Sequence, residues 1–158
     1  MRRFRPDYES CGISKYRFDE LLAFCKQYPE KKAEAETLLG VGSPAMSGMP
    51  HGSSVGDPVS RATEKRERLL HDCAVIEKCA NAVDNGRFSV AIIQNACYGK
   101  GYEFIKEYLP TWHRQSFYTA RRKFYYLLNK CLELRDKFDE WYEEMKRSGD
   151  SSKTMWVS

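Results

Sequence analysis

The chain has 158 residues, 42% of them hydrophobic and 30% charged, and a formal net charge of +4. This length suits one domain or a small domain with an appendage, and the composition is that of a globular protein in water. No apolar run approaches the ~20 residues that cross a bilayer, and the basic N-terminus lacks the apolar region of a signal peptide. We therefore expect a cytoplasmic protein without a membrane partner.

Cysteine spacing gives no sign of a metal site. The six cysteines form no Cys-x-x-Cys pair, and no histidine lies at zinc-finger spacing from them. Several fall on apolar positions of helical patterns, so we interpret them as reduced, buried small side chains rather than as a disulfide framework. We expect neither a metal nor a cofactor.

The first part of the chain, residues 1–39, reads as an N-terminal helical segment. Ser14 to Tyr28 carries apolar residues at 18, 21, 22 and 25, which is helical spacing. We expect Pro29 to break this helix and a second short helix to run from Glu30 to Leu39.

Residues 40–58 (GVGSPAMSGMPHGSSVGDP) hold five of the ten glycines and three of the six prolines. Such a density of helix and strand breakers predicts a flexible loop, the internal segment most open to proteases. Met46, Met49 and His51 are unusual in a pure spacer and leave open that the loop docks on something. A fragment from about residue 59 is expected to stay folded without residues 1–58 and to bind its partner.

Three more helices are expected before residue 110. Residues 59–83 show an apolar repeat near 3.5 and nearly balanced charges, which predicts one long helix with a single buried seam. Residues 88–98 suit a strand or a buried helix, and we predict a helix because no partner strand is present. Residues 102–109 are predicted helical, with Phe104, Ile105 and Leu109 turned inward.

The last predicted helix runs from about His113 to Arg147, with apolar residues at alternating steps of three and four. The fold class is therefore all-α: a helical bundle with a C-terminal helix-turn-helix and a long C-terminal helix. Residues 59–147 form its helical domain, and 148–158 are expected to be a disordered tail. The apolar seam beyond Leu128 needs a cover, either the 59–83 helix of the same chain or a second copy in a homodimer.

The positive charge is concentrated in one place. Residues 100–130 contain seven Lys and Arg against two Glu. If Phe117, Ala120, Phe124 and Leu127 face the core, the opposite face of the helix is basic. Uncompensated positive charge is costly unless a polyanion meets it, and the continuous apolar seam suits packing better than a membrane surface. Nucleic acid is the favoured partner.

The helix-turn-helix is expected at about 102–130, with the turn at Pro110 and the second helix in the major groove of double-stranded DNA. The outward positions on that helix are Gln115, Tyr118, Thr119 and Arg122, whose side chains suit base edges, thymine methyl groups or phosphates. Lys100, Arg114, Arg121 and Lys123 are better placed for phosphates. The alternative is a basic, solvated face that binds nothing.

The chain also resembles a family, on three pieces in the same order: Tyr16–Glu30, Gly48–Arg61 (GMPHGSSVGDPVSR) and Arg114–Leu128 (RQSFYTARRKFYYLL). These pieces, which span roughly residues 14–130, are similar to phage regulators of late transcription of the ArpU/RinA type. The turn before the last piece is one residue longer than the usual pattern, and the helix continues through Arg147. The resemblance implies a phage or prophage origin, a bacterial host cell, a sigma-factor-like helix-turn-helix and RNA polymerase as a further partner.

Three functions stay open at this point. The first is a sequence-specific DNA-binding transcriptional regulator. The second is a phage DNA-packaging protein of the small-terminase kind, and the third is a protein-interaction module that uses the C-terminal heptads. An enzyme is not expected, because no nucleophile, acid–base pair or metal motif is recognisable in the sequence.

Overall fold

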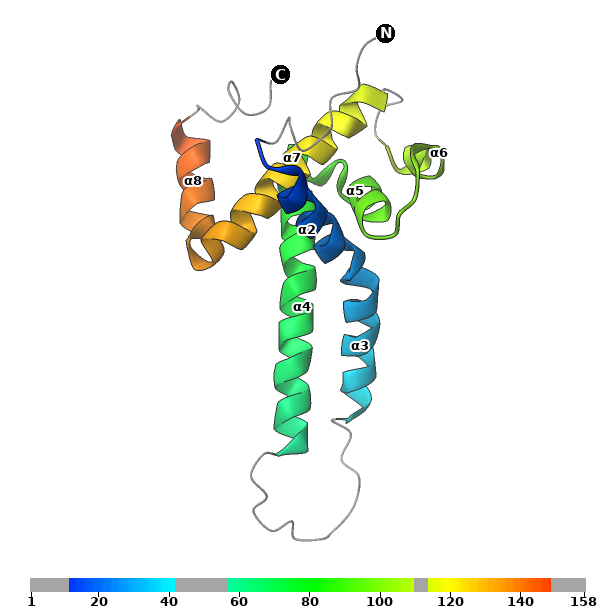
Figure 1. Ribbon diagram of the computed structural model, residues 1–158, viewed down its shortest axis with the longest axis vertical. Coiled ribbons are helices and arrows are strands. Elements are labelled where there is room, and N and C mark those ends of the chain that lie inside the picture. Colours follow the sequence, from blue (N-terminus) through cyan, green and yellow to red (C-terminus); the bar gives the residue numbers. More distant parts are fainter. Residues whose placement is uncertain (1–11, 42–56, 110–113, 149–158) are drawn as a thin grey trace.

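The computed structural model describes residues 12–41, 57–109 and 114–148, and within these ranges every regular element is a helix. The all-α prediction is confirmed. In chain order the elements are α2 (Lys15–Lys26), α3 (Tyr28–Val41), α4 (Pro58–Ala82), η1 (Val83–Gly86), α5 (Ser89–Ala96), α6 (Tyr102–Ile105), η2 (Lys106–Tyr108), α7 (Arg114–Leu134), η3 (Arg135–Lys137) and α8 (Phe138–Ser148). Helices α3 and α4 form a long arm, and the other helices gather at one end of α4 as a head (Figure 1).

The two N-terminal helices are separated by a single residue. The Ser14 hydroxyl caps α2 by accepting a hydrogen bond from the Arg17 N–H at 3.1 Å, which satisfies one of the free donors of the first turn. Helix α3 starts at Tyr28, so Pro29 lies in its first turn, where a missing N–H costs nothing. The expectation that Pro29 separates the two helices was therefore wrong: the proline opens the second helix.

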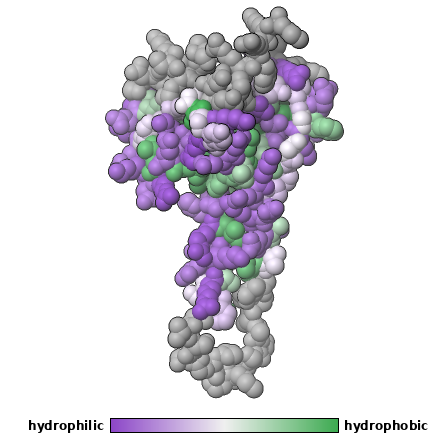
Figure 2. All heavy atoms as spheres, viewed as in Figure 1, coloured by the Kyte–Doolittle hydropathy of each residue, from purple (hydrophilic) through white to green (hydrophobic). Residues whose placement is uncertain are grey.

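The arm is held together by charge pairs that run across it. Lys31 Nζ lies 2.8 Å from an oxygen of Asp72, and Lys32 Nζ lies 2.7 Å from Glu77 Oε1. A further pair joins Lys65 to Glu34 nearer the free end of the arm. The described surface of the arm is mostly hydrophilic in Figure 2, as expected for two helices that bury only one seam each.

The head has one hydrophobic core, to which helices from both ends of the described chain contribute. Fully buried side chains come from α2 (Leu21, Cys25), α4 (Cys79, Ala80), α5 (Ala91, Ile92), α6 (Ile105) and α7 (Phe117, Ala120, Phe124, Leu128). Because α2 shares this core, a fragment from residue 59 would lose part of the packing of α7. The expectation that such a fragment stays folded does not agree with this arrangement.

Two segments of ambiguous pattern have a definite place in the head. Residues 88–98 hold helix α5, as predicted, with Ala91 and Ile92 inaccessible to solvent. Helix α6 buries Ile105, and Leu109 packs partly buried against the core, as predicted, but Phe104 is 72% exposed, so the prediction that it turns inward was wrong. Consecutive residues of a helix point about 100° apart, and a helix this short buries only one of them.

The predicted single C-terminal helix is broken into two. Helix α7 ends at Leu134, and Arg135 adopts a left-handed conformation with φ 50° before α8 begins at Phe138. Helix α7 crosses the head obliquely, and α8 turns back from its end (Figure 1). A straight continuation would carry the apolar stripe of α8 away from the core, whereas the break returns it.

Helix α8 packs on α4 and α7 of the same chain. Phe138 is only 2% exposed, and the Tyr142 hydroxyl lies 3.5 Å from the Ala82 carbonyl oxygen at the end of α4. Asp139 pairs with Lys78 of α4, whose ammonium group also lies 5.2 Å from the centre of the Phe138 ring. The apolar seam beyond Leu128 is thus covered within one chain: α8 folds back, and its apolar face packs against α4 and α7.

The cysteines that the structure describes, at 25, 73, 79, 97 and 131, are free and buried, as predicted, and Cys11 lies outside the described residues. Contact with the Cys97 thiol, together with burial, raises the pKa of Cys25 far above its ordinary value. These side chains serve as small apolar residues of the core.

Candidate nucleic-acid interface

The residues of α7 that pack into the core are unavailable to a partner, so a partner could contact only the residues on its other faces. Phe117, Ala120, Phe124 and Leu127 are all buried, as the spacing predicted. The second half of the helix is covered more widely, because α2 lies across it. The Phe18 and Tyr125 rings meet edge to face with centroids 4.9 Å apart. The exposed residues of α7 before its crossing with α2 are Arg114 and Gln115, and the other outward residues of its first three turns are half-buried.

Three of the four residues predicted on the outward face share one line of the helix. Gln115 is exposed, and Thr119 and Arg122 are half-buried. The Arg122 guanidinium donates a hydrogen bond to the Thr119 hydroxyl at 3.1 Å, one turn back along the helix. Spacings of four and three place these residues above one another, so they can meet one ligand together.

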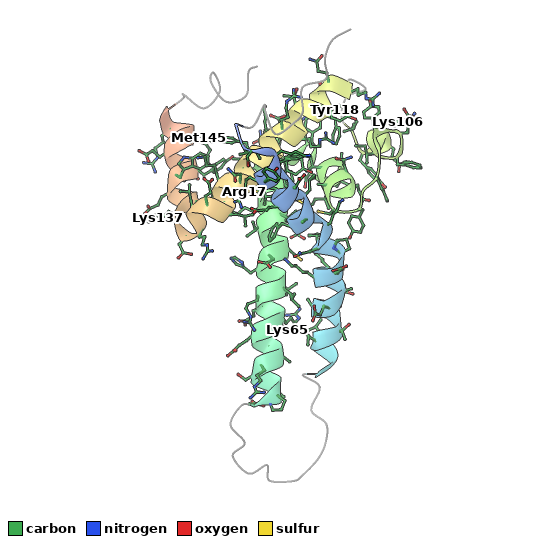
Figure 3. The ribbon with its side chains drawn as sticks, in the orientation of Figure 1. Arg17, Lys65, Lys106, Tyr118, Lys137 and Met145 are labelled. Atoms are coloured by element: carbon green, nitrogen blue, oxygen red, sulfur yellow. The ribbon has the colours of Figure 1, made fainter. Side chains whose placement is uncertain are left out.

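Tyr118, the fourth predicted residue, belongs to the flank of the helix. Its ring stacks on Tyr102 of α6, with centroids 6.4 Å apart and an angle of 23° between the planes. Arg114 lies within 5.6 Å of both ring centres, and the Arg121 guanidinium lies 4.8 Å from the Tyr118 ring. In Figure 3, Tyr118 lies beside α6. The prediction of Tyr118 on the same line as Gln115 and Arg122 needs correction, because α6 covers this flank.

Arg121 is held from α5 by Asn95, a residue that the sequence did not single out. The Asn95 side-chain oxygen accepts from Arg121 at 3.1 Å, and its amide nitrogen donates to the Lys100 carbonyl at 2.8 Å. One amide thus ties together Arg121 and the loop that bears the exposed Lys100. A polar residue within the apolar stretch 88–98 was the signal that could have found it.

Lys123 lies on the other flank, paired with an acid. Its ammonium nitrogen is 3.2 Å from Asp84 Oδ1, in the turn that follows α4. Asp84 and Asn85 are left-handed, with φ 45° and 58°, and Gly86 follows with φ 82°. The sequence predicted that a long helix ends at residue 83, but could not show that the turn after it lies against α7.

An open groove of about 750 Å³ runs between that turn and the start of α7. Its walls are Asp84, Arg87 and Phe88 on one side and Arg114, Gln115, Ser116 and Thr119 on the other.

Helix α6 and the following 3-10 turn η2 share a charge pair. Lys106 Nζ lies 2.8 Å from Glu103, and this hydrogen bond lowers the pKa of Glu103 and raises that of Lys106. Along α7, in contrast, no acidic residue occurs before Glu133. From Lys100 to Lys123 the sequence carries six Lys and Arg against two Glu, which is a positive excess.

Helices α6 and α7 flank residues 110–113, which lie outside the described residues. The helix-turn-helix geometry thus stays a prediction. No helix among the described residues is long and apolar enough to cross a membrane. The chain matches no family model, and no curated protein or solved structure matches it either.

Proposed function

We propose that this protein is a sequence-specific DNA-binding transcriptional regulator in which the first three turns of α7 enter the major groove of duplex DNA. One observation carries the proposal. Between Arg114 and Lys130, α7 has five Lys and Arg and no acid, and its apolar face is wholly occupied by the core. Arg114 is exposed and Arg121, Arg122 and Lys123 are half-buried, so burial in the core does not explain this basic face, and a polyanion would.

We infer different tasks for the two groups of polar residues. Gln115, Thr119 and Arg122 form the outward line and suit base edges: glutamine pairs with adenine, arginine with guanine, and threonine meets a thymine methyl group. Arg114 and Arg121 are held on the flank by Tyr118, and this fixed position suits phosphates. Lys100 extends the phosphate contacts from the loop before α6.

The resemblance to ArpU/RinA-type regulators supports a phage or prophage origin and a role in transcription, with RNA polymerase as a further partner. A second copy of the chain is not needed to cover α8, since Phe138 is buried in one chain. A ring-forming packaging protein would instead need an extensive subunit interface.

Selection of binding sites from random duplex DNA tests the proposal. A preferred sequence should emerge, and Gln115→Ala or Arg122→Ala should relax the preference at one or two base pairs, costing ~1–3 kcal/mol on that site. Arg121→Ala should weaken all sequences alike. If these three variants behaved identically on preferred and random DNA, the assignment of tasks would be wrong, and absence of binding at low salt would refute DNA binding itself.

A further inference from the structure

The turn after α4 brings a cation beside α7 that lies outside the helix-turn-helix segment. Arg87 is exposed and lines the groove opposite Arg114. Three successive left-handed residues, Asp84, Asn85 and Gly86, reverse the chain and set the position of Arg87. Such conformations are uncommon for residues other than glycine and persist where the surrounding structure holds them.

The α7 wall of the groove is continuous with the outward line of that helix. Gln115 and Thr119 belong to both, and Ser116 adds a hydroxyl to the wall. A DNA strand whose bases meet Gln115 must carry its sugar-phosphate backbone past one flank of the helix. The flank toward α6 is occupied by the Tyr102–Tyr118 stack, whereas the flank toward Arg87 is open.

We propose that this groove holds the sugar-phosphate backbone of duplex DNA between Arg87 and Arg114, with Arg87 as a phosphate contact outside the recognition helix. The inference rests on the proposed DNA binding and adds a site to it. The Arg87 guanidinium can hold a phosphate in the groove, and the hydroxyl groups of Ser116 and Thr119 are further donors. Such contacts fix the register of the protein on DNA without reading its sequence.

Asp84 gives the groove a built-in opposing charge. Its carboxylate lines the same wall as Arg87 and pairs with Lys123 at 3.2 Å. A phosphate in the groove would be repelled by this carboxylate. Removing the charge of Asp84 should therefore strengthen DNA binding, even though Asp84 itself makes no contact with DNA in this proposal.

The first test compares two arginine variants that change the net charge equally. Arg87→Ala removes the proposed contact, and Arg68→Ala, on the exposed surface of the arm, is the control. Affinity is measured by fluorescence anisotropy on a random duplex at several salt concentrations. Arg87→Ala should weaken binding roughly tenfold at low salt and make the slope of log K against log salt shallower by about 0.9. Arg68→Ala should change neither quantity beyond experimental error.

The second test predicts the opposite sign. Asp84→Asn should bind all duplexes more tightly, by about twofold to fivefold at low salt, and asparagine accepts the left-handed conformation at this position. Melting curves of both variants check that the fold is kept.

The outcomes separate this inference from the proposed function. If Arg122→Ala weakens binding but Arg87→Ala behaves like Arg68→Ala and Asp84→Asn gives no gain, the groove is not the backbone site, while DNA binding stands. If the wild-type protein binds no duplex at low salt, both proposals fail.

Discussion

The arm and the first half of α7 both carry many charges, but the charges have different surroundings. In the arm, lysines meet carboxylates across the two helices, as Lys31 meets Asp72 and Lys32 meets Glu77. On α7, the guanidinium groups of Arg114 and Arg121 lie over tyrosine rings, which hold a cation in place without cancelling its charge. A surface of matched charge pairs needs no partner, whereas cations ordered by aromatic rings are suited to an anionic ligand.

The largest expected effect tests whether head and arm differ in how they are packed. Leu21 is fully buried in the head, and Leu39 is 56% exposed near the end of the arm. Leu21→Ala should lower the free energy of unfolding by about 2–5 kcal/mol, because it leaves a cavity between α2 and the rest of the core. Leu39→Ala, the matched control, should change it by no more than about 0.5 kcal/mol.

Urea unfolding followed by circular dichroism measures both variants. Equal small losses would mean that α2 is only loosely attached to the head. The fragment from residue 59 would then be expected to fold by itself.

The next effect concerns the part of the head that α8 completes. Phe138→Asp would place a carboxylate at a site that is 2% exposed, and we expect a loss of stability above ~3 kcal/mol. Because the cover of Phe138 is intramolecular, the melting temperature of the wild-type protein should not depend on its concentration. A wild-type melting temperature that rises with concentration, with a variant that sediments as a smaller species, would show that a second copy covers α8 instead.

The buried seam of α7 could be predicted because packing repeats along a helix with a fixed period. Phe117, Ala120 and Phe124 follow that period, and the residues between them are mostly polar or charged, so the pattern can be seen in the sequence. The break at Arg135 could not be predicted. The residue is neither glycine nor proline, and the apolar stripe resumes in phase at Phe138, so no local pattern marks the turn.

The sequence could predict the residues that α7 contributes to the candidate site, but not those that other elements contribute. Arg122 and Gln115 follow from the helix itself, whereas Tyr118 depends on α6, which covers one flank. Asp84 and Arg87 come from a distant part of the chain, and only the tertiary fold brings them to α7. Periodicity reports which face of a helix is buried, but it does not report which other elements border the face that remains.

A smaller effect on DNA affinity is expected from Tyr118, whose ring holds the two arginines of α7. Tyr118→Ala should weaken binding to all duplexes roughly tenfold, because two guanidinium groups lose the ring that orders them. Tyr118→Phe keeps the ring and should stay within about twofold of the wild type. The matched control is Tyr16→Ala, at an 81% exposed tyrosine of α2, which should have no effect. If Tyr118→Phe instead lost preference at one base pair, the hydroxyl would be reading a base, as the sequence first suggested.

The smallest effect lies at the base of the arm, where charges are matched. The Tyr28 hydroxyl donates to Glu77 at 2.6 Å, and Lys32 approaches the same carboxylate at 2.7 Å. Burial raises the pKa of Glu77, but the hydrogen bonds from Lys32 and Tyr28 outweigh it and hold the pKa below its ordinary value. Burial and then the hydrogen bond to Glu77 raise the pKa of Tyr28 to about 12.

These shifts fix the sign of the pH dependence. A depressed carboxylate pKa contributes stability above the ordinary pKa of about 4.3, and this stability is lost as the pH falls through the lower folded-state value. The raised pKa of Tyr28 acts the other way: its contribution is present below about pH 10 and is lost as the pH rises toward 12.

Glu77→Gln should therefore lower the free energy of unfolding at neutral pH by no more than about 1 kcal/mol, since the Glu77 side chain is 36% exposed and water screens the pair. The difference from the wild type should shrink as the pH falls below about 4, because the wild-type carboxyl is then protonated as well. Urea unfolding at a series of pH values measures it, and Glu36→Gln, on the exposed surface of the same arm, should leave the whole profile unchanged. A gap that stayed constant from neutral to acidic pH would show that the carboxylate charge contributes nothing there, and that shape or hydrogen bonding alone accounts for the loss.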